Sequence, residues 1–314
     1  MQNINPFSPK LDIISENIIF LLSIDSKVSI NDLARKLAVS RKRVENRQNK
    51  LYSSGLIKPL LIYNHKDVIK ATILIKLSSF DNKVISSITE LNKFIKVKET
   101  LGAYDLSLLI IVSKEKQLFE VLTRINKMFH QSIQNMDVIR HDIEDTLGYK
   151  SFCHDIRLSG NYEILDYDKG YTLAKDDDVL ITMLRDEPLI SYNKLVKSTG
   201  WNYLRIKSSI DRLRQAKIIR FSIDPDYQKL GLEFHNLLIK INLAKRRQFE
   251  KNIVSHPKIH WMKRCTGSWD YILSVTASSM GEFIDVTREI RTQNKEIILN
   301  FGSLISNIHV MRKG

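Results

Sequence analysis

Basic side chains are concentrated in residues 40–50, which read SRKRVENRQNK. Val44 and Leu51 have the spacing of one helix face, and Ser40 is a residue type that often caps a helix N-terminus. Arginine can donate two hydrogen bonds to guanine O6 and N7, whereas lysine contacts phosphate as a point charge. The segment therefore predicts a DNA-reading helix, and its predicted contacts are Ser40, Arg41, Lys42, Arg43, Arg47 and Lys50.

Within this helix we expect Arg41 and Arg43 at base edges and Lys50 at a phosphate. Three consecutive cations at a helix N-terminus oppose the helix dipole, at a cost of roughly a few tenths of a kcal/mol each. A bound anion would explain their placement. The alternative for any basic helix is a solvated face, and helices of this kind also serve protein contacts.

Two further helices and a strand are predicted to hold the basic helix in place. The apolar residues of LDIISENIIFLL have helical spacing, and SINDLARKLA begins with Ser29, whose capping-box partner is Asp32. Gly55 supplies a stop after the third helix. Three short helices with a tight turn between the second and third predict a helix-turn-helix. The apolar LIKPLLIYN that follows, with Pro59, suits the strand of a wing.

The same plan recurs 162 positions later, where Arg43 aligns with Arg205 and Leu51 with Leu213. A duplication explains this agreement better than coincidence. Trp201 in the turn and Lys217 in place of the terminating glycine are departures from the first copy. The predicted DNA contacts of the second copy, whose first turn is less basic, are Asn202 at the cap, Tyr203, Arg205 and Lys207.

The second part of each copy has a different pattern. In copy one, ATILIKLSS, VKETL, DLSLLIIV and MDVIRHDIEDTLGY are predicted strands, whereas NKVISSITELNKF and KQLFEVLTRINKMF are predicted helices. The order βαββαβ is that of a ferredoxin-like domain, and copy two repeats it. The fold class expected is α+β, with two tandem copies of a winged helix-turn-helix followed by a ferredoxin-like domain.

These elements divide the chain into four predicted domains and a linker. Residues 151–172 have no sustained period and are interpreted as the linker. The predicted domains are a first winged helix-turn-helix at 1–66, a first ferredoxin-like domain at 67–150, a second winged helix-turn-helix at 173–228 and a second ferredoxin-like domain at 229–314.

Composition limits the classes of protein that fit. The chain has 314 residues, 43% hydrophobic and 27% charged, with a formal net charge of +14 that favours polyanionic partners such as nucleic acid. Only Cys153 and Cys265 are present, so a disulfide framework is not expected. The first ten residues lack the apolar segment of a signal peptide and no long apolar run occurs, which predicts a soluble, cytoplasmic protein.

Taken together, the motifs resemble those of the Lrp/AsnC family of regulators. The resemblance rests on LDIISENIIFLL, on LARKLAVSRKRVENRQNKLYSSGLI and its second copy, and on GAYD and SHPKIHWMKRCTGSWDYILSV. It implies transcriptional regulation at palindromic double-stranded DNA sites, dimerisation through the ferredoxin-like sheet and an amino-acid or related effector. The tandem departs from the family, so the copies could pair internally or with a second chain. Unlike recognition helices then predict imperfectly palindromic DNA sites.

The turns GAYD and GSWD mark the same predicted hairpin in the two copies. Glycine can supply a positive φ there, the aromatic residue can fill a sheet face, and aspartate can bind a nearby backbone N–H, so geometry alone would justify all three. The family resemblance adds that these turns border an effector pocket. The predicted effector contacts are Gly102, Tyr104 and Asp105 in copy one and Gly267, Trp269 and Asp270 in copy two.

Enzymatic alternatives have less support in the sequence. Sirohaem decarboxylases share the two-domain plan, but they carry histidine at the hairpin, which neither GAYD nor GSWD contains. No nucleotide-binding glycine motif is present, and Cys153 beside His154 lacks a second ligand pair at zinc spacing. We expect no cofactor, no metal and no enzymatic activity. A decarboxylase-like enzyme and an effector-sensing scaffold that does not bind DNA are the alternatives.

Overall fold

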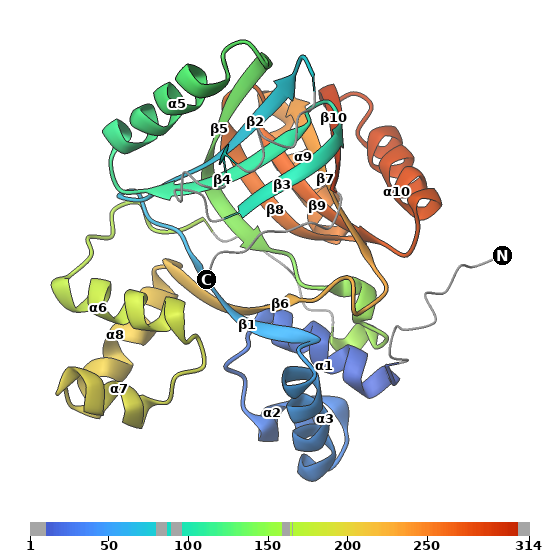
Figure 1. The fold of residues 1–314 in the computed structure, drawn as a ribbon. Coiled ribbons are helices and arrows are strands. Elements are labelled where there is room, and N and C mark those ends of the chain that lie inside the picture. The colour runs from blue at the N-terminus through green and yellow to red at the C-terminus, as the bar shows by residue number, and fades with distance from the viewer. Residues whose placement is uncertain (1–10, 80–86, 89–95, 159–163, 165, 307–314) are drawn as a thin grey trace. The chain divides into compact units, whose positions relative to one another are not determined.

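The computed structural model describes residues 11–79, 87–88, 96–158, 164 and 166–306. These residues form a mixed α+β fold, as predicted, in two compact units that interleave along the chain (Figure 1). The first unit comprises the described residues of 11–65, 145–158, 164, 166–233 and 254–261, and the second comprises those of 66–79, 87–88, 96–144, 234–253 and 262–306. The predicted helix at 82–94 lies largely outside the described residues. The chain-order domain boundaries stay predictions.

The first unit contains two groups of three helices, each followed by a strand (Figure 1). Each element of one group begins and ends 162 positions from its counterpart, which is the offset predicted from the sequence. The first group is α1 (Ile13–Ile24), α2 (Ile30–Leu37), α3 (Arg41–Ser53) and β1 (Ile57–Tyr63). The second is α6 (Lys175–Asp186), α7 (Tyr192–Thr199), α8 (Tyr203–Gln215) and β6 (Ile219–Pro225).

Local side-chain chemistry sets the ends of these helices. Ser40 caps α3 and accepts a hydrogen bond from the Arg43 backbone N–H, and Ser29 caps α2 by accepting one from Asp32. Val44 and Leu51 are buried, as the helical spacing predicts. The capping and the inward face of the third helix are therefore confirmed.

The last turn of each third helix ends in a residue with a left-handed backbone. Gly55 has φ of 66° after α3, and Lys217 has φ of 58° at the equivalent place after α8. In both copies the following N–H closes the turn, Leu56 to the Leu51 carbonyl and Ile218 to the Leu213 carbonyl. Lys217 therefore keeps the turn geometry without the glycine that the conformation favours.

Replacing Lys217 with glycine should raise the free energy of unfolding by about 0.5–1 kcal/mol. A residue other than glycine costs roughly 1–2 kcal/mol in the left-handed conformation. Glycine avoids this cost, but it also loses more conformational entropy on folding, so the net gain is smaller. Urea denaturation of the full chain measures the difference. Gly55→Ala is the matched control and should lower stability, so opposite signs are expected. Equal or reversed signs would show that backbone strain at Lys217 is absent.

β1 and β6 pair with each other as an antiparallel two-stranded sheet, with Ile57 opposite Pro225 and Tyr63 opposite Ile219. The predicted wing strands of the two copies therefore pair with each other. The physical reason is an exchange of core residues. Leu61 of β1 packs into the core of the second helical group, and Ile223 of β6 packs into that of the first. The two groups therefore complete each other's cores.

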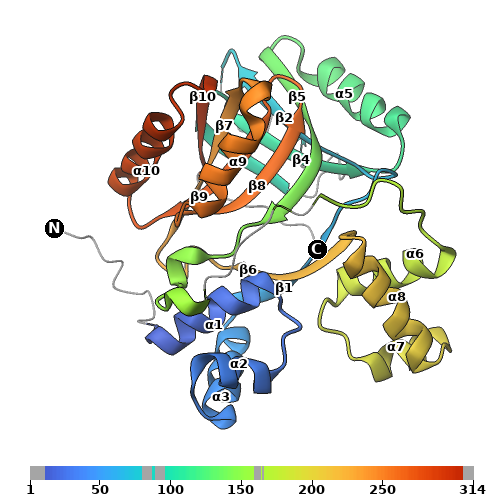
Figure 2. The same ribbon diagram turned by 180° about the vertical axis from the view of Figure 1, so that it is seen from behind.

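The second unit is a closed barrel of eight strands (Figure 2). Its strand order is β10-β3-β4-β2-β5-β8-β9-β7. The four strands of copy one are therefore neighbours on one side of the barrel, and the four strands of copy two are neighbours on the other. The barrel strands are β2 (Ile69–Leu77), β3 (Lys96–Gly102), β4 (Leu106–Val112), β5 (Ile133–Thr146), β7 (Glu233–Ile241), β8 (Ile259–Thr266), β9 (Tyr271–Ala277) and β10 (Ile298–Ser306).

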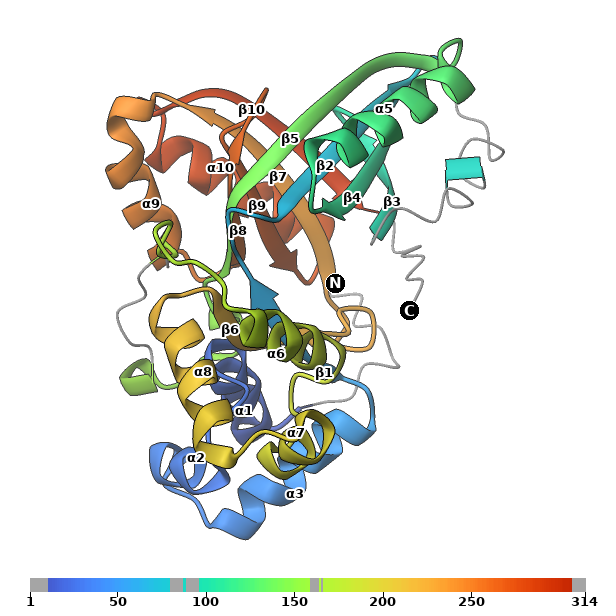
Figure 3. The same cartoon turned by 90° about the vertical axis from the view of Figure 1, so that its left-hand side faces the viewer.

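Among the described residues, three helices of two turns or more lie on the outside of the barrel (Figure 3). They are α5 (Glu115–Phe129), α9 (Arg246–Ser255) and α10 (Met280–Gln293). Leu118 and Ile125 of α5 are buried in a core with strand residues Ile73 and Leu108. Within the described residues, no helix combines the length and apolar character needed to cross a membrane.

Closure of the barrel creates two seams between the copies, β3 with β10 and β5 with β8. At the β5–β8 seam, Glu144 lies between two lysines, with Lys70 Nζ at 3.1 Å and Lys263 Nζ at 3.3 Å. Burial raises the pKa of Glu144, but the two ammonium groups outweigh it and hold that pKa well below its usual range. A carboxylate from copy one thus binds one lysine from each copy.

Candidate functional site

Helix α3 presents cations to solvent from its first turn to its last. Arg41, Lys42, Arg43 and Lys50 are all exposed. Lys42 lies 3.8 Å from Glu45 on the same helix, which is a weak contact at the surface. Among the described residues, the side chains of Arg41, Arg43 and Lys50 have no acidic partner. The first-copy helix therefore carries three uncompensated positive charges on its outward face.

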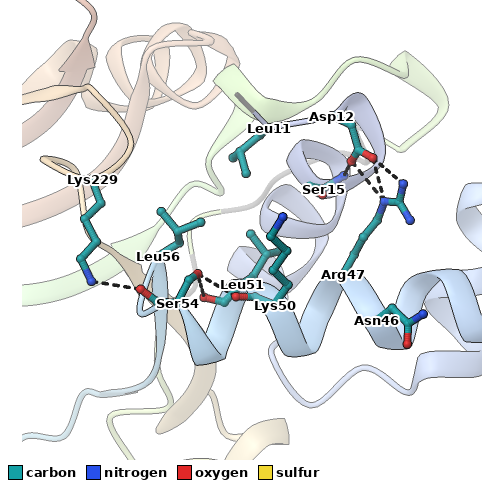
Figure 4. Close-up of a pocket in the computed structure, with 10 residues that line it drawn as sticks. All are labelled: Leu11, Asp12, Ser15, Asn46, Arg47, Lys50, Leu51, Ser54, Leu56 and Lys229. Carbon is teal, nitrogen blue, oxygen red and sulfur yellow. Dashed lines mark hydrogen bonds and ion pairs between the residues drawn. The ribbon is translucent and has the colours of Figure 1, made fainter. Parts of the chain in front are cut away.

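Arg47 is the exception on this helix, because it binds inside the first helical group (Figure 4). Its Nε lies 2.9 Å from Oδ2 of Asp12, the N-cap residue of α1. The Arg47 guanidinium holds the pKa of the Asp12 carboxyl well below its usual range. Of the predicted DNA contacts in copy one, Arg47 is thus the side chain whose charge is already offset.

In the second copy, the cation equivalent to Arg43 is held in a contact of its own. Arg205 Nε lies 2.8 Å from Asp176 Oδ2 in the first turn of α6, and its guanidinium stacks 4.6 Å from the Trp201 ring. Asn202 caps α8 as predicted, accepting from the Arg205 N–H at 2.8 Å. Tyr203 and Lys207 are exposed.

The later cations of α8 are paired as well. Arg212 lies 2.7 Å from Asp177, and Arg214 lies 2.6 Å from Asp25. Helices α3 and α8, the third helix of each group, have equivalent bounds and the same cap geometry. They differ in charge, because three arginines of α8 have acidic partners. These pairs could not be predicted from the sequence, because each acid lies far from its arginine in the chain.

The two glycines of the hairpin turns lie against the backbone of the opposite copy. Gly102 has φ of 117°, and a Cβ there would be 2.4 Å from the Ser303 carbonyl oxygen. Gly267 has φ of 135°, and a Cβ would be 2.8 Å from the Val138 carbonyl oxygen. Each glycine therefore serves both the turn and the close approach of strands at a seam.

The two aspartates make the same pair of contacts in each copy. Asp105 accepts from the Leu77 N–H at 2.8 Å and lies 3.0 Å from Lys76 Nζ. Asp270 accepts from the Ile241 N–H at 2.9 Å and lies 3.0 Å from Lys240 Nζ. Both carboxylates thus connect the hairpin turn to the end of the first barrel strand of their own copy, β2 or β7.

The two aromatic residues meet in the barrel interior. Tyr104 and Trp269 are 6% and 7% exposed, and Trp269 Nε1 donates to the Tyr104 hydroxyl at 3.4 Å. The Tyr104 hydroxyl donates to the Asp137 carboxylate, and burial raises the pKa of Tyr104 to about 12. The structure therefore brings together the aromatic residues of the two hairpin turns. Effector contact at the turns stays a prediction.

Comparison with known proteins finds similarity to one family over part of the chain. Residues 237–297 match the family model described as the Lrp/AsnC ligand binding domain. An uncharacterized HTH-type transcriptional regulator of Pyrococcus horikoshii is 29% identical over 140 residues, which are 41% of this chain and 91% of that protein. A similar regulator of Pyrococcus furiosus is 28% identical over 105 residues, 33% of this chain and 71% of that protein. The predicted resemblance to the Lrp/AsnC family is confirmed.

A solved structure matches the whole chain rather than one copy. The siroheme decarboxylase NirDL has a TM-score of 0.61, with 96% of this chain and 93% of that chain covered. The sequence identity is 12%, so this likeness shows the fold alone. The part of the chain that the structure describes contains no group of three or more histidine, cysteine or acidic residues that could hold a metal ion.

Proposed function

We propose that the chain is a sequence-specific, DNA-binding transcriptional regulator of the Lrp/AsnC type that carries two recognition helices in one polypeptide. The observation that carries the proposal is the capped first turn of α3, where Arg41 and Arg43 are exposed and, among the described residues, have no acidic partner. A helix-turn-helix reads the major groove with the N-terminal residues of this helix. The HTH-type regulators among the relatives support the same function.

The pairing of charges supports unequal roles for the two helices. Arg43 can reach a base or phosphate without breaking a contact, whereas Arg205 must first leave Asp176 and Trp201. We infer that α3 is the main reader of the DNA sequence and that α8 adds contacts to flanking phosphates through Lys207. Because α3 and α8 differ in sequence and are followed by the paired strands β1 and β6, they suit a DNA site whose two halves differ in sequence.

Substituting the two equivalent arginines tests this assignment. Arg43→Ala should weaken binding to a selected duplex about 10- to 100-fold, since a good arginine–base contact contributes roughly 1–3 kcal/mol. Arg205→Ala removes a side chain of the same type at the matched position and should weaken binding less than about 3-fold. Gel-shift titrations with the wild-type protein and both variants on one duplex give the comparison.

Either of two results would contradict the assignment. Equal losses from the two variants would mean that α8 reads DNA as strongly as α3. No loss from Arg43→Ala, with the protein folded, would remove α3 from the interface. Circular dichroism of both variants provides the folding control, because both side chains are exposed and their removal should leave the helices intact.

The mode of assembly and the effector belong to the same proposal. Pairing of the copies within one chain, through β1–β6 and through both barrel seams, supports an internal pseudo-dimer. An amino-acid effector, as the family resemblance implies, would have to reach the hairpin turns from outside the barrel, because Tyr104 and Trp269 fill its interior. We propose no enzymatic activity.

A decarboxylase of the NirDL kind is the second candidate, favoured by the match over 96% of the chain. Incubation of the purified protein with sirohaem, followed by mass spectrometry of the tetrapyrrole, separates the two functions. The regulator proposal expects unchanged sirohaem, whereas loss of carboxyl groups would establish the enzyme. A protein that neither binds DNA nor alters sirohaem would be the effector-sensing scaffold.

A further inference from the structure

A cavity of about 640 Å³ lies in the first unit, between α1, α3 and the segment that follows β6 (Figure 4). Its volume is within the usual range of small-ligand sites. Leu11, Leu51 and Leu56 supply its apolar wall. Cavities of this size with a few polar groups on an apolar wall are suited to small organic molecules rather than to ions alone.

The charges around the cavity favour an anion. Asp12 and Arg47, both in the wall, offset each other through their ion pair. Among the described residues, the Lys50 ammonium group donates no hydrogen bond and has no acidic partner. Lys229 donates to the Ser54 carbonyl at 3.0 Å and lies 3.9 Å from Asp226. The cavity therefore carries uncompensated positive charge at Lys50.

In the second helical group, the positions equivalent to the cavity wall are occupied by interacting side chains of the protein itself. Ser15 and Lys50 correspond, at the offset of 162, to Asp177 and Arg212. There the hydroxyl of Tyr171 donates to Asp177 at 2.9 Å and accepts from Arg212 Nε at 2.7 Å. The phenol group of Tyr171 and the carboxylate of Asp177 thus both bind the Arg212 guanidinium of α8.

The first copy lacks the carboxylate, because its counterpart of Asp177 is Ser15. A molecule bound there would need to bring a negative charge for Lys50 and a ring for the leucine wall. We propose that this cavity binds a small aromatic carboxylate, with the carboxylate at Lys50 and the ring against Leu51 and Leu56. The proposal stands apart from DNA binding, since it concerns the affinity of the chain for the small molecule alone.

Calorimetric titration of the full chain with 3-(4-hydroxyphenyl)propanoate tests the proposal. This probe joins the phenol ring of a tyrosine side chain to a carboxylate. We expect saturable one-site binding that Lys50→Met weakens at least about 10-fold, since a hydrogen bond to a charged group contributes roughly 1.5–3 kcal/mol. Arg212→Met changes the matched position of the second copy and should leave the affinity unchanged.

Two further ligands separate the parts of the proposal. The neutral amide of the probe should bind about 10-fold more weakly, and octanoate, which keeps the charge without the ring, should also bind more weakly. No saturable heat with the probe would overturn the proposal, as would equal losses from Lys50→Met and Arg212→Met. Octanoate binding as tightly as the probe would overturn the aromatic assignment. Lys50→Met removes an exposed side chain, whereas Arg212→Met also removes a partner of the buried Asp177, so circular dichroism must show both variants folded before their affinities are compared.

Discussion

If the proposed function is correct, the affinity of the protein for a selected DNA duplex should fall by about 10³- to 10⁵-fold when salt is raised from 50 to 200 mM. This follows if α3, α8 and the residues beside them make roughly 6–10 phosphate contacts, because each contact releases counterions from the duplex. Gel shifts or fluorescence anisotropy across a salt series measure the slope. The net charge of +14 and the uncompensated cations of α3 are the physical basis of the expectation.

A duplex with a scrambled sequence is the control for this series. It should show a similar slope at weaker affinity, since phosphate contacts act on any sequence and base contacts do not. A flat salt response would contradict the proposed DNA interface. A steep response without any preference between the two duplexes would support a DNA-binding protein that lacks sequence specificity.

Replacing Gly102 or Gly267 with alanine should lower the free energy of unfolding by roughly 2–6 kcal/mol. Two costs combine, the strain of a positive φ and the overpacking of a methyl group against a backbone carbonyl, at roughly 1–3 kcal/mol each. The carbonyls belong to Ser303 and Val138, in strands that cannot move without opening a seam. Urea denaturation followed by tryptophan fluorescence measures the loss.

Gly281→Ala is the matched control for these variants. Gly281 lies in α10, and a Cβ there would meet nothing nearer than the Ser279 hydroxyl at 3.7 Å. Alanine favours a helix over glycine, so this variant should be as stable as the wild-type protein or slightly more stable. If all three variants unfold at one urea concentration, close approach at the seams is not what these glycines serve.

The helical groups were predictable because their signals are local. Ser40 and Asn202 at the caps and the spacing of Val44 and Leu51 are each decided within one or two turns of chain. The offset of 162 between the copies appeared in the sequence for the same reason, since equivalent residues occupy equivalent turns. Lys217 shows the limit, because it adopts a conformation for which glycine is the usual signal.

Barrel closure could not be read from the strands. Alternation of apolar and polar residues indicates which face of a strand is buried, but not which strands pair along its two edges. The same pattern therefore fits a sheet within one copy and a barrel formed by both copies. The choice depends on contacts far apart in the chain, such as Thr266 with Asp142 or Glu144 with Lys263. The partners of Arg47 and Arg205 were hidden in the same way, although the arginines themselves were identified.

The pairing of β1 with β6 has a consequence for dilution and for mutation. In a protein assembled from two identical chains, the halves separate as concentration falls, and every substitution occurs in both. Here the covalent connection holds one half at a high effective concentration beside the other, so the sheet should persist at any dilution. A change in one half leaves the other intact, which allows Tyr104 and Trp269, or Arg43 and Arg205, to differ in chemistry while their backbones stay alike.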